Sequence, residues 1–364
     1  MRSLIDICDL SPREIAEMIT VATDIINHPA KYAERCKGKK IATLFFEPST
    51  RTRLSFEAAM YELGGNVLPV PGEALSSAAK GESIADTVRV ISSYADIIAM
   101  RSPKEGAAFV AAGSATVPII NAGDGGHCHP TQTLADLFTI YREKGSFDNL
   151  TVGFCGDLKY GRTVHSLITA LSRYHGVKIV LISPEELRLP NYVKIGVIEK
   201  AGMEYLETDD LEKAIPSLDI LYMTRIQQER FEDKAEYDRL KDAYILTAEK
   251  MQAAKKDACV MHPLPRVNEI SVKVDDDPRA CYFKQVENGK YIRMALILKL
   301  LEEAAKDGKR EDLLRGKEIL VGETGCENPR CISQTEQELA KLFKVVDKEA
   351  NICRCVYCEK RKHF

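Results

Sequence analysis

The sequence predicts an α/β fold with two doubly wound parallel-sheet domains and a small C-terminal zinc-binding domain. The chain has 364 residues, 45% of them hydrophobic, enough to bury two sizeable cores. Short apolar runs alternate with amphipathic stretches through the first 300 residues, a pattern typical of parallel sheets covered by helices. Five of the eleven cysteines crowd into positions 326 to 358, which sets that segment apart.

Seven apolar runs are predicted to form buried strands: 39–46, 95–101, 117–123, 150–157, 177–183, 218–225 and 258–263. The amphipathic stretches predict helices, notably at 53–65, 130–144, 162–176 and 203–215. Turn residues in 143–157 indicate a boundary between domains. We therefore expect a first domain at 1–134 completed by a helix at 286–306, a second at 135–285, a charged linker at 307–319 and the cysteine-rich domain at 320–364.

Charge and hydropathy exclude several classes of protein. A net charge of −3 gives no overall attraction to nucleic acid or membranes, although a local basic pocket could still bind a small anion. The N-terminus lacks the apolar core of a signal peptide, and no apolar run is long enough for a membrane span. We expect a cytoplasmic protein whose cysteines are reduced or bind metal.

The segment "FFEPSTRTRLSFEAAM" (45–60) carries the first candidate site. Ser49, Thr50, Arg51 and Thr52 stand where a strand ends and a helix begins. Backbone N–H groups at a helix N-terminus, hydroxyls and a guanidinium together make a cradle for phosphate. A capped helix with surface arginines is the simpler alternative.

Further polar residues follow other predicted strands. Arg101 ends the run 95–101, and His129 follows 117–123 with Gln132 close behind. Carboxyl ends of parallel strands are where open sheets bind ligands. His127 is interpreted as structural.

The second domain repeats this arrangement. Arg162 and Thr163 open a helix after the strand 150–157 in "GDLKYGRT", which approaches a nucleotide-binding P-loop but has Arg162 where that motif needs lysine. Arg225 and Gln227 lie on one face at the end of 218–225, and a guanidinium there suits a carboxylate.

At these residues the chain resembles the aspartate and ornithine carbamoyltransferases, whose signature Ser-Thr-Arg-Thr-Arg binds the phosphate of carbamoyl phosphate. The resemblance continues in order through "SSAAKGESIADTVRV" (76–90), "MRSPKEGAA" (100–108), "HPTQTLADL" (129–137), "GDLKYGRTVHSL" (156–167), "MTRIQQERF" (223–231), "HPLPR" (262–266) and "VENGKYIRMAL" (286–296).

The resemblance implies a role for each candidate. The carbamoyl phosphate site would comprise Ser49, Thr50, Arg51, Thr52, Arg101, His129, Gln132, Pro263 and Leu264. The aspartate site would comprise Ser76, Lys80, Arg162, Thr163, Arg225, Gln227 and Leu264. Catalysis would rest on Arg51, Thr52, Lys80, Arg101 and His129, which stabilise a tetrahedral oxyanion without any cofactor.

The resemblance also bears on assembly and on the amine substrate. Ser76 and Lys80 match a loop that enters the neighbouring subunit's active site in aspartate carbamoyltransferases, which implies a homotrimer or a multiple of trimers. "HPLPR" and "TRIQ" stand where ornithine enzymes carry other motifs. We therefore expect L-aspartate as the acceptor. Asn268, where the family usually has Asp, removes a possible ion-pair partner.

The tail carries a separate pattern. "CENPRC" (326–331) and "CRCVYC" (353–358) offer four thiolates for a tetrahedral structural zinc at Cys326, Cys331, Cys355 and Cys358. Cys353 could replace Cys355. This tail resembles the zinc domain of the aspartate carbamoyltransferase regulatory chain, normally a separate polypeptide, without the nucleotide-binding half of that chain.

The sequence thus predicts transfer of a carbamoyl group to the amine of L-aspartate in pyrimidine biosynthesis. The alternatives are a carbamoyltransferase for ornithine or another amino acid, a catalytically silent scaffold and, least favoured, a P-loop NTPase.

Overall fold

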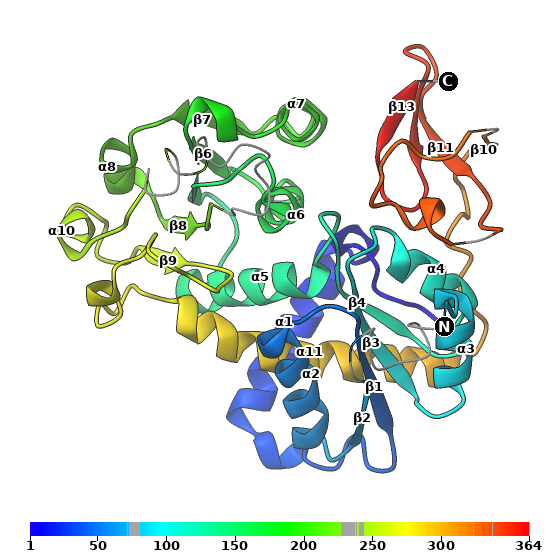
Figure 1. The fold of residues 1–364 in the computed structure, drawn as a ribbon. Helices are drawn as coiled ribbons and strands as arrows, with labels where there is room; N and C mark the ends of the chain where they lie inside the picture. The colour runs from blue at the N-terminus through cyan, green and yellow to red at the C-terminus, as the bar shows by residue number, and fades with distance from the viewer. Residues whose placement is uncertain are drawn as a thin grey trace. The chain divides into compact units, whose positions relative to one another are not determined.

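The computed structural model describes residues 1–70, 72, 81–226, 237, 239, 244–322, 324–336 and 338–363. The chain divides into two compact units, Met1–Thr131 with Lys290–Phe364, and Gln132–Gly289. Each unit contains one parallel sheet, and the first also contains a small antiparallel sheet near the C-terminus (Figure 1). The predicted fold class is confirmed. Among the helices of the described residues, none is long and apolar enough to cross a membrane.

The first unit is built on a sheet with strand order β2-β1-β3-β4. Its strands are β1 Lys40–Phe45, β2 Asn66–Val70, β3 Ile97–Ser102 and β4 Ile119–Asp124. Pro69 is tolerated in β2 because this strand lies at the sheet edge, where a missing N–H breaks no ladder. The chain winds in opposite directions from β1 and β3, so a topological switch point lies at the carboxyl ends of these two strands.

The helix α1 Pro12–Asn27 precedes β1, and α2 Thr50–Glu62, α3 Ile84–Ser92 and α4 Ala107–Ser114 follow β1, β2 and β3. The helix α11 Tyr282–Lys306 begins in the second unit and ends in the first. α1 begins with a capping box, in which the Ser11 side chain accepts from the N–H of Glu14 and the Glu14 carboxylate accepts from the N–H of Ser11. α11 begins four residues before the predicted helix at 286–306.

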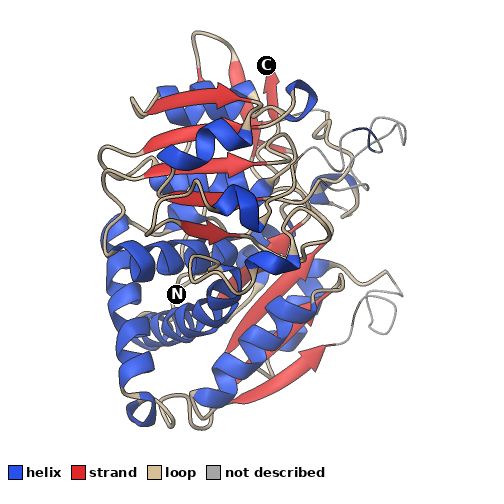
Figure 2. Ribbon diagram, turned by 90° about the vertical axis from the view of Figure 1, so that its left-hand side faces the viewer, coloured by secondary structure: helices blue, strands red, loops and turns tan. Residues whose placement is uncertain are grey.

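The second unit has the strand order β7-β6-β5-β8-β9, all parallel. Its strands are β5 Thr151–Cys155, β6 Lys178–Ile182, β7 Glu204–Thr208, β8 Ile220–Met223 and β9 Cys259–Met261. Its helices include α5 Pro130–Lys144, α6 Arg162–Leu171, α7 Asn191–Val193 with the π-helix Lys194–Glu199, α8 Leu211–Ala214 and α10 Ala248–Met251. Figure 2 shows the strands stacked side by side with helices in front of and behind them. The switch point of this sheet lies between β5 and β8.

The prediction of a helix at 203–215 was wrong. The first half of this stretch is the strand β7, and only Leu211–Ala214 is helical. β7 pairs with β6 alone and is an edge strand. Its side chains Tyr205 and Leu206 are exposed, so the stretch lacks the continuous apolar run that marks a buried strand.

The C-terminal domain is a four-stranded antiparallel sheet, β10 Ile319–Val321, β11 Leu342–Asp347, β12 Ile352–Cys355 and β13 Arg361–His363. It packs on its own chain, because one cluster of buried side chains includes Ala108 of α4 together with Ile332 and Tyr357. The Phe109 and Tyr357 rings meet edge to face with centroids 5.7 Å apart. The connecting segment 307–318 also contacts the first unit, since the N–H of Glu311 donates to the Met1 carbonyl at 3.0 Å.

Candidate functional site

The phosphate-binding residues of the prediction lie at the switch point of the first sheet. Ser49 is the N-cap of α2 and Thr50 its first residue, directly after β1. Arg101 lies opposite Phe45 in the neighbouring strand β3. Its Nη1 donates to Ser49 Oγ at 3.1 Å and its Nε to Glu47 Oε1 at 2.6 Å. The structure therefore brings the start of α2 and Arg101 together.

The two arginines of the Ser-Thr-Arg-Thr-Arg segment differ in their surroundings. Arg53 pairs with Glu57 one turn along α2, with Nε 3.3 Å from Oε1. Arg51 makes no ion pair with any described acidic residue, and its pKa is lowered by partial burial and by the neighbouring Arg101 guanidinium. Two nearby cations, of which Arg101 alone pairs with a described carboxylate, favour the binding of an anion. Thr52 is buried in the first turn beside them.

His129 follows β4 at the same edge of the sheet and is 5% exposed. Its Nδ1 lies 3.5 Å from Thr131 Oγ1. The preceding turn is closed by paired hydrogen bonds between Asp124 and Cys128. His129 is therefore presented by a hydrogen-bonded turn on the strand next to Arg101.

Sequence reasoning missed two residues that hold this half-site. Glu47 orients Arg101 through the contact given above. Arg293 of α11 donates to Ser55 Oγ at 3.0 Å and to the Thr131 carbonyl at 3.4 Å, so it ties α2 to the segment after His129. Glu47 and Arg293 both lie inside motifs of the sequence analysis. The only feature of the sequence that could have identified them is a charged side chain close to a predicted functional residue.

The carboxylate-binding residues of the prediction lie at the switch point of the second sheet. Arg162 is the first residue of α6, after β5, and Arg225 follows β8. The ends of β5 and β8 are joined because Thr224 Oγ1 donates to the Cys155 carbonyl and accepts from the N–H of Asp157, both at 2.9 Å.

Thr163 and Gln132 contribute to a buried polar network in this unit. Thr163 hydrogen bonds with Tyr222, whose hydroxyl donates to Asp136 Oδ2 at 3.0 Å. Gln132 Nε2 donates to Asp136 Oδ1 at 2.8 Å. In this structure the side chains of Thr163 and Gln132, both predicted to bind ligand, are thus hydrogen bonded to other residues of the protein.

The His-Pro-Leu-Pro-Arg corner follows β9. His262 Nδ1 accepts from the N–H of Leu264 at 2.8 Å, which leaves Nε2 to donate to Glu269 Oε1 at 2.7 Å. Burial opposes ionisation of Glu269, but its contact with His262 lowers the carboxyl pKa below the ordinary value. Leu264 has φ +49° and precedes a cis peptide bond to Pro265. These contacts fix the carbonyls of Pro263 and Leu264, which accept no hydrogen bond from another described residue.

Three predicted residues, Ser76, Lys80 and Gln227, lie outside the described residues. The predicted contribution of the loop around Lys80 therefore stays a prediction.

The tail cysteines converge as the spacing predicts. The sulfur atoms of Cys326, Cys331, Cys355 and Cys358 all lie within 4.8 Å of one another. Two of the sulfur pairs are 3.5 and 3.7 Å apart, close to the edge of about 3.8 Å for a tetrahedron with zinc–sulfur bonds of about 2.3 Å. Cys353 is not in the cluster, and its thiol donates to the Lys362 carbonyl at 3.4 Å. Four buried thiols in this geometry fit a structural metal ion.

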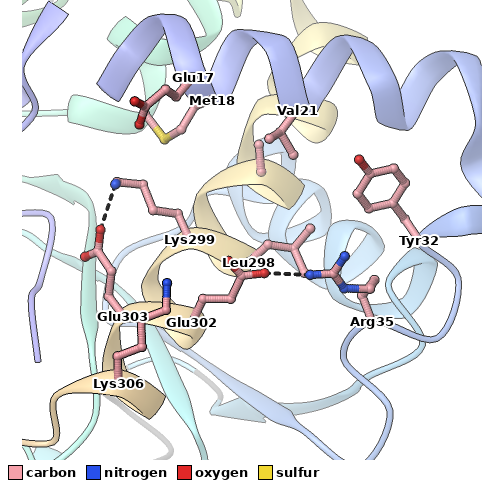
Figure 3. A pocket seen from close by; sticks show the side chains of 11 residues that line it. Glu17, Met18, Val21, Tyr32, Arg35, Leu298, Lys299, Glu302, Glu303 and Lys306 are labelled. Atoms are coloured by element: carbon pink, nitrogen blue, oxygen red, sulfur yellow. Dashed lines mark hydrogen bonds and ion pairs between the residues drawn. The ribbon is translucent and has the colours of Figure 1, made fainter. Parts of the chain in front are cut away.

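A pocket of about 270 Å³ lies away from these strand ends, between α1 and α11 (Figure 3). Four of its charged side chains already pair with one another: Arg35 with Glu302 at 2.6 Å, and Lys299 with Glu303 at 2.7 Å. The pocket therefore offers no converging unpaired charge from these four side chains.

Family models match almost the whole chain. Residues 2–142 match the carbamoyl-phosphate-binding domain of aspartate/ornithine carbamoyltransferases, and residues 148–300 match the Asp/Orn-binding domain. Residues 318–363 match the metal-binding domain of the aspartate carbamoyltransferase regulatory chain.

Two curated relatives are catalytic subunits of aspartate carbamoyltransferase. The aspartate carbamoyltransferase catalytic subunit of Lachnoclostridium phytofermentans is 61% identical over 301 residues, covering 83% of this chain and 98% of the relative. That of Clostridium novyi is also 61% identical, over 300 residues, covering 82% of this chain and 98% of the relative.

Two solved structures cover the same part of the chain. The catalytic subunit of M. jannaschii aspartate transcarbamoylase superposes with a TM-score of 0.79 at 47% identity, covering 84% of this chain and all of that one. The Trypanosoma cruzi enzyme in complex with carbamoyl phosphate and aspartate gives a TM-score of 0.78 at 39% identity, covering 82% of this chain and 96% of that one. The chain belongs to the aspartate/ornithine carbamoyltransferase family and carries, at its C-terminus, the metal-binding domain of the aspartate carbamoyltransferase regulatory chain.

Proposed function

We propose that this protein is an aspartate carbamoyltransferase, which transfers the carbamoyl group of carbamoyl phosphate to the amine of L-aspartate in pyrimidine biosynthesis. The observation that carries the proposal is Arg51 beside Arg101 at the start of α2, a cationic site for phosphate. The identity to aspartate carbamoyltransferases, and the T. cruzi complex with both substrates, support the same reaction.

The carbamoyl phosphate residues would act mainly through electrostatics. Backbone N–H groups at the start of α2 and the Arg51 guanidinium would hold the phosphate. Thr52, Arg101 and His129 would donate to the carbonyl oxygen as negative charge develops on it. The amine attacks the carbonyl carbon and loses a proton, the bond from that carbon to the phosphate oxygen breaks, and phosphate departs with the electron pair.

The second unit would hold the acceptor. Arg162 and Arg225 would bind the two carboxylates of aspartate in bidentate geometry, beside Thr163 and Gln227. The carbonyls of Pro263 and Leu264 would receive the carbamoyl NH2 and the attacking amine, which suits their fixed backbone. Gln132 would leave its contact with Asp136 to reach carbamoyl phosphate.

Assembly and metal content extend the proposal. Lys80 and Ser76 would enter a neighbouring subunit's site, which requires a homotrimer or a multiple of trimers working in the cytoplasm. The four clustered thiols would hold one structural zinc, because tetrahedral sulfur sites favour that ion. Light scattering and metal analysis of the purified protein test both statements.

The activity test is an assay with carbamoyl phosphate and a panel of amines. Aspartate should be the preferred acceptor, and Arg51→Ala should lose at least about a hundredfold in kcat/KM, as expected when a phosphate clamp is removed. Arg13→Ala is the matched control and should keep the turnover, because Arg13 is an exposed arginine of α1 that pairs with Glu17. Turnover with ornithine and none with aspartate would refute the proposal.

A further inference from the structure

The turn that presents His129 is closed immediately before that residue. Asp124 and Cys128 form an antiparallel bridge, with the Asp124 N–H donating to the Cys128 carbonyl at 3.2 Å. The N–H of His127 donates to the Asp124 carbonyl at 3.1 Å. The position of His129 therefore depends on how firmly the turn from Asp124 to Cys128 is held.

The Asp124 side chain is the centre of this turn and is 1% exposed. Its Oδ1 accepts from Asn121 Nδ2 and from the N–H of Cys128, both at 3.0 Å. Its Oδ2 accepts from the N–H of Gly106 and from His127 Nδ1, both at 2.9 Å. Four donors occupy both oxygens, so this carboxylate is the hydrogen-bond acceptor at the centre of the turn.

His127 supplies the only ionisable donor among these four. Its side chain is 12% exposed, and its Nε2 is buried without a hydrogen bond to any described residue. The acidic groups that act on it come from three segments: Asp124 in β4, Asp6 near the N-terminus and Glu359 in the metal-binding domain. The thiol of Cys128 donates to Asp6 Oδ2 at 2.9 Å. A protonated His127 imidazole would balance the charge of the buried Asp124 carboxylate, with which it is in direct contact.

We propose that His127 is a positioning residue for carbamoyl transfer, whose positive charge holds Asp124 and, through it, the turn that sets His129. The inference rests on the proposed function. The hydrogen bond that the His127 side chain makes with a described residue goes to Asp124, so its effect on the reaction would be indirect. Its effect passes from Nδ1 to the Asp124 carboxylate, and from there to the N–H of Cys128, the residue that precedes His129.

The metal-binding domain is linked to the same turn through Glu105. Glu105 Oε1 accepts from the N–H of Gly126 at 3.2 Å, and its Oε2 accepts from Asn328 Nδ2 at 2.6 Å. Glu105 is also paired through its backbone with Cys331, one of the four clustered cysteines. The turn is thus fixed by a buried cation within it and by a carboxylate shared with the tail.

Protonation of His127 should appear in the pH dependence. Burial opposes its charge, but Asp124 raises the pKa of His127 from 6.5 to about 9, with Asp6 and Glu359 contributing. Because the folded-state pKa is raised, the stabilisation is complete below pH 6.5 and is lost as the pH rises through about 9. The kcat/KM for carbamoyl phosphate should fall over the same range.

The decisive variant is His127→Asn, which keeps an N–H donor near the Nδ1 position and removes the charge. We expect kcat/KM for carbamoyl phosphate to fall by about tenfold or more, as misplacement of a catalytic group does, with KM for aspartate little changed. The alkaline fall of the wild-type protein near the His127 pKa should be absent. His28→Asn is the matched control, because His28 makes the same Nδ1 contact with Asp24 at 2.8 Å but is 64% exposed.

Binding measurements separate this inference from the proposed function. By calorimetry, His127→Asn should bind phosphonoacetamide, a stable analogue of carbamoyl phosphate, more weakly, and inorganic phosphate as well as before, because His129 would contact the carbonyl alone. Equal phosphonoacetamide affinity and equal pH profiles in the two proteins would overturn the role of His127 while leaving the activity intact. If His127→Asn does not fold, the imidazole of the wild-type protein is titrated by NMR. Titration of His127 near its ordinary pKa would also overturn the inference, whereas loss of its proton together with the alkaline fall in kcat/KM would support it.

Discussion

Substitution of Gly106 by alanine should loosen the metal-binding domain from the first unit. Gly106 has φ +87°, and a Cβ at this position would lie 2.5 Å from Tyr357 Cβ and 2.7 Å from the Tyr357 carbonyl oxygen. The left-handed backbone costs about 1–2 kcal/mol for a residue with a Cβ. Overlap with a packed backbone adds about 1–3 kcal/mol, because neither partner is the end of a flexible side chain.

Gly38→Ala is the control for backbone strain alone. Gly38 has φ +79°, and a Cβ there would meet nothing within 4 Å. The difference between the two variants should therefore be about 1–3 kcal/mol, which is about 5- to 150-fold in the docking equilibrium. Hydrogen exchange measures it at two amides of this contact, Glu105 N–H to the Arg330 carbonyl and Ile332 N–H to the Glu105 carbonyl, each at 2.9 Å.

Both amides should exchange faster in Gly106→Ala and remain protected in Gly38→Ala. Unchanged protection in Gly106→Ala, with a loss of overall stability equal to that of Gly38→Ala, would refute the packing argument.

The tail and the first helix give two further predictions. By elemental analysis, Cys331→Ser should reduce the bound metal from one ion per chain to near zero. Cys353→Ser should retain the metal, because the Cys353 thiol contacts the Lys362 carbonyl and lies outside the four-sulfur cluster. Equal loss of metal in both variants would contradict the assignment of the four sulfur ligands. Burial opposes ionisation of Glu14, but hydrogen bonds from Arg2 and Ser11 lower its pKa from 4.5 to about 2, so its stabilisation is present above pH 4.5 and is lost as the pH falls towards 2. Glu14→Gln should accordingly flatten the loss of stability in acid denaturation, and an unchanged acid transition would contradict this.

The sequence predicted those site residues that lie directly after the carboxyl end of a strand. Ser49, Arg101, Arg162 and Arg225 could be proposed because apolar runs fix where strands stop, and the carboxyl ends of parallel strands share an edge. β7 could not be predicted, because an edge strand with exposed side chains lacks the apolar run that marks its buried neighbours.

Contacts made by tertiary packing were beyond sequence reasoning. Cys353 and Cys355 both offer chelating spacings to Cys358, and only the fold of β12 and the turn after it selects Cys355. The hydrogen bonds of Glu105 depend on where the tail packs, so neither its sequence neighbours nor its charge reveals them. His127 was interpreted as structural because it matches no position of the family's histidine motif.

The joining of the tail to α11 by the short segment 307–318 has a thermodynamic consequence. A domain tethered by about a dozen residues meets its docking surface at an effective concentration in the millimolar range, whatever the protein concentration. Docking is therefore unimolecular and should not change on dilution, and each chain carries one copy of the domain by construction. A metal-binding domain supplied as a separate polypeptide would instead dissociate as the protein is diluted below its binding constant.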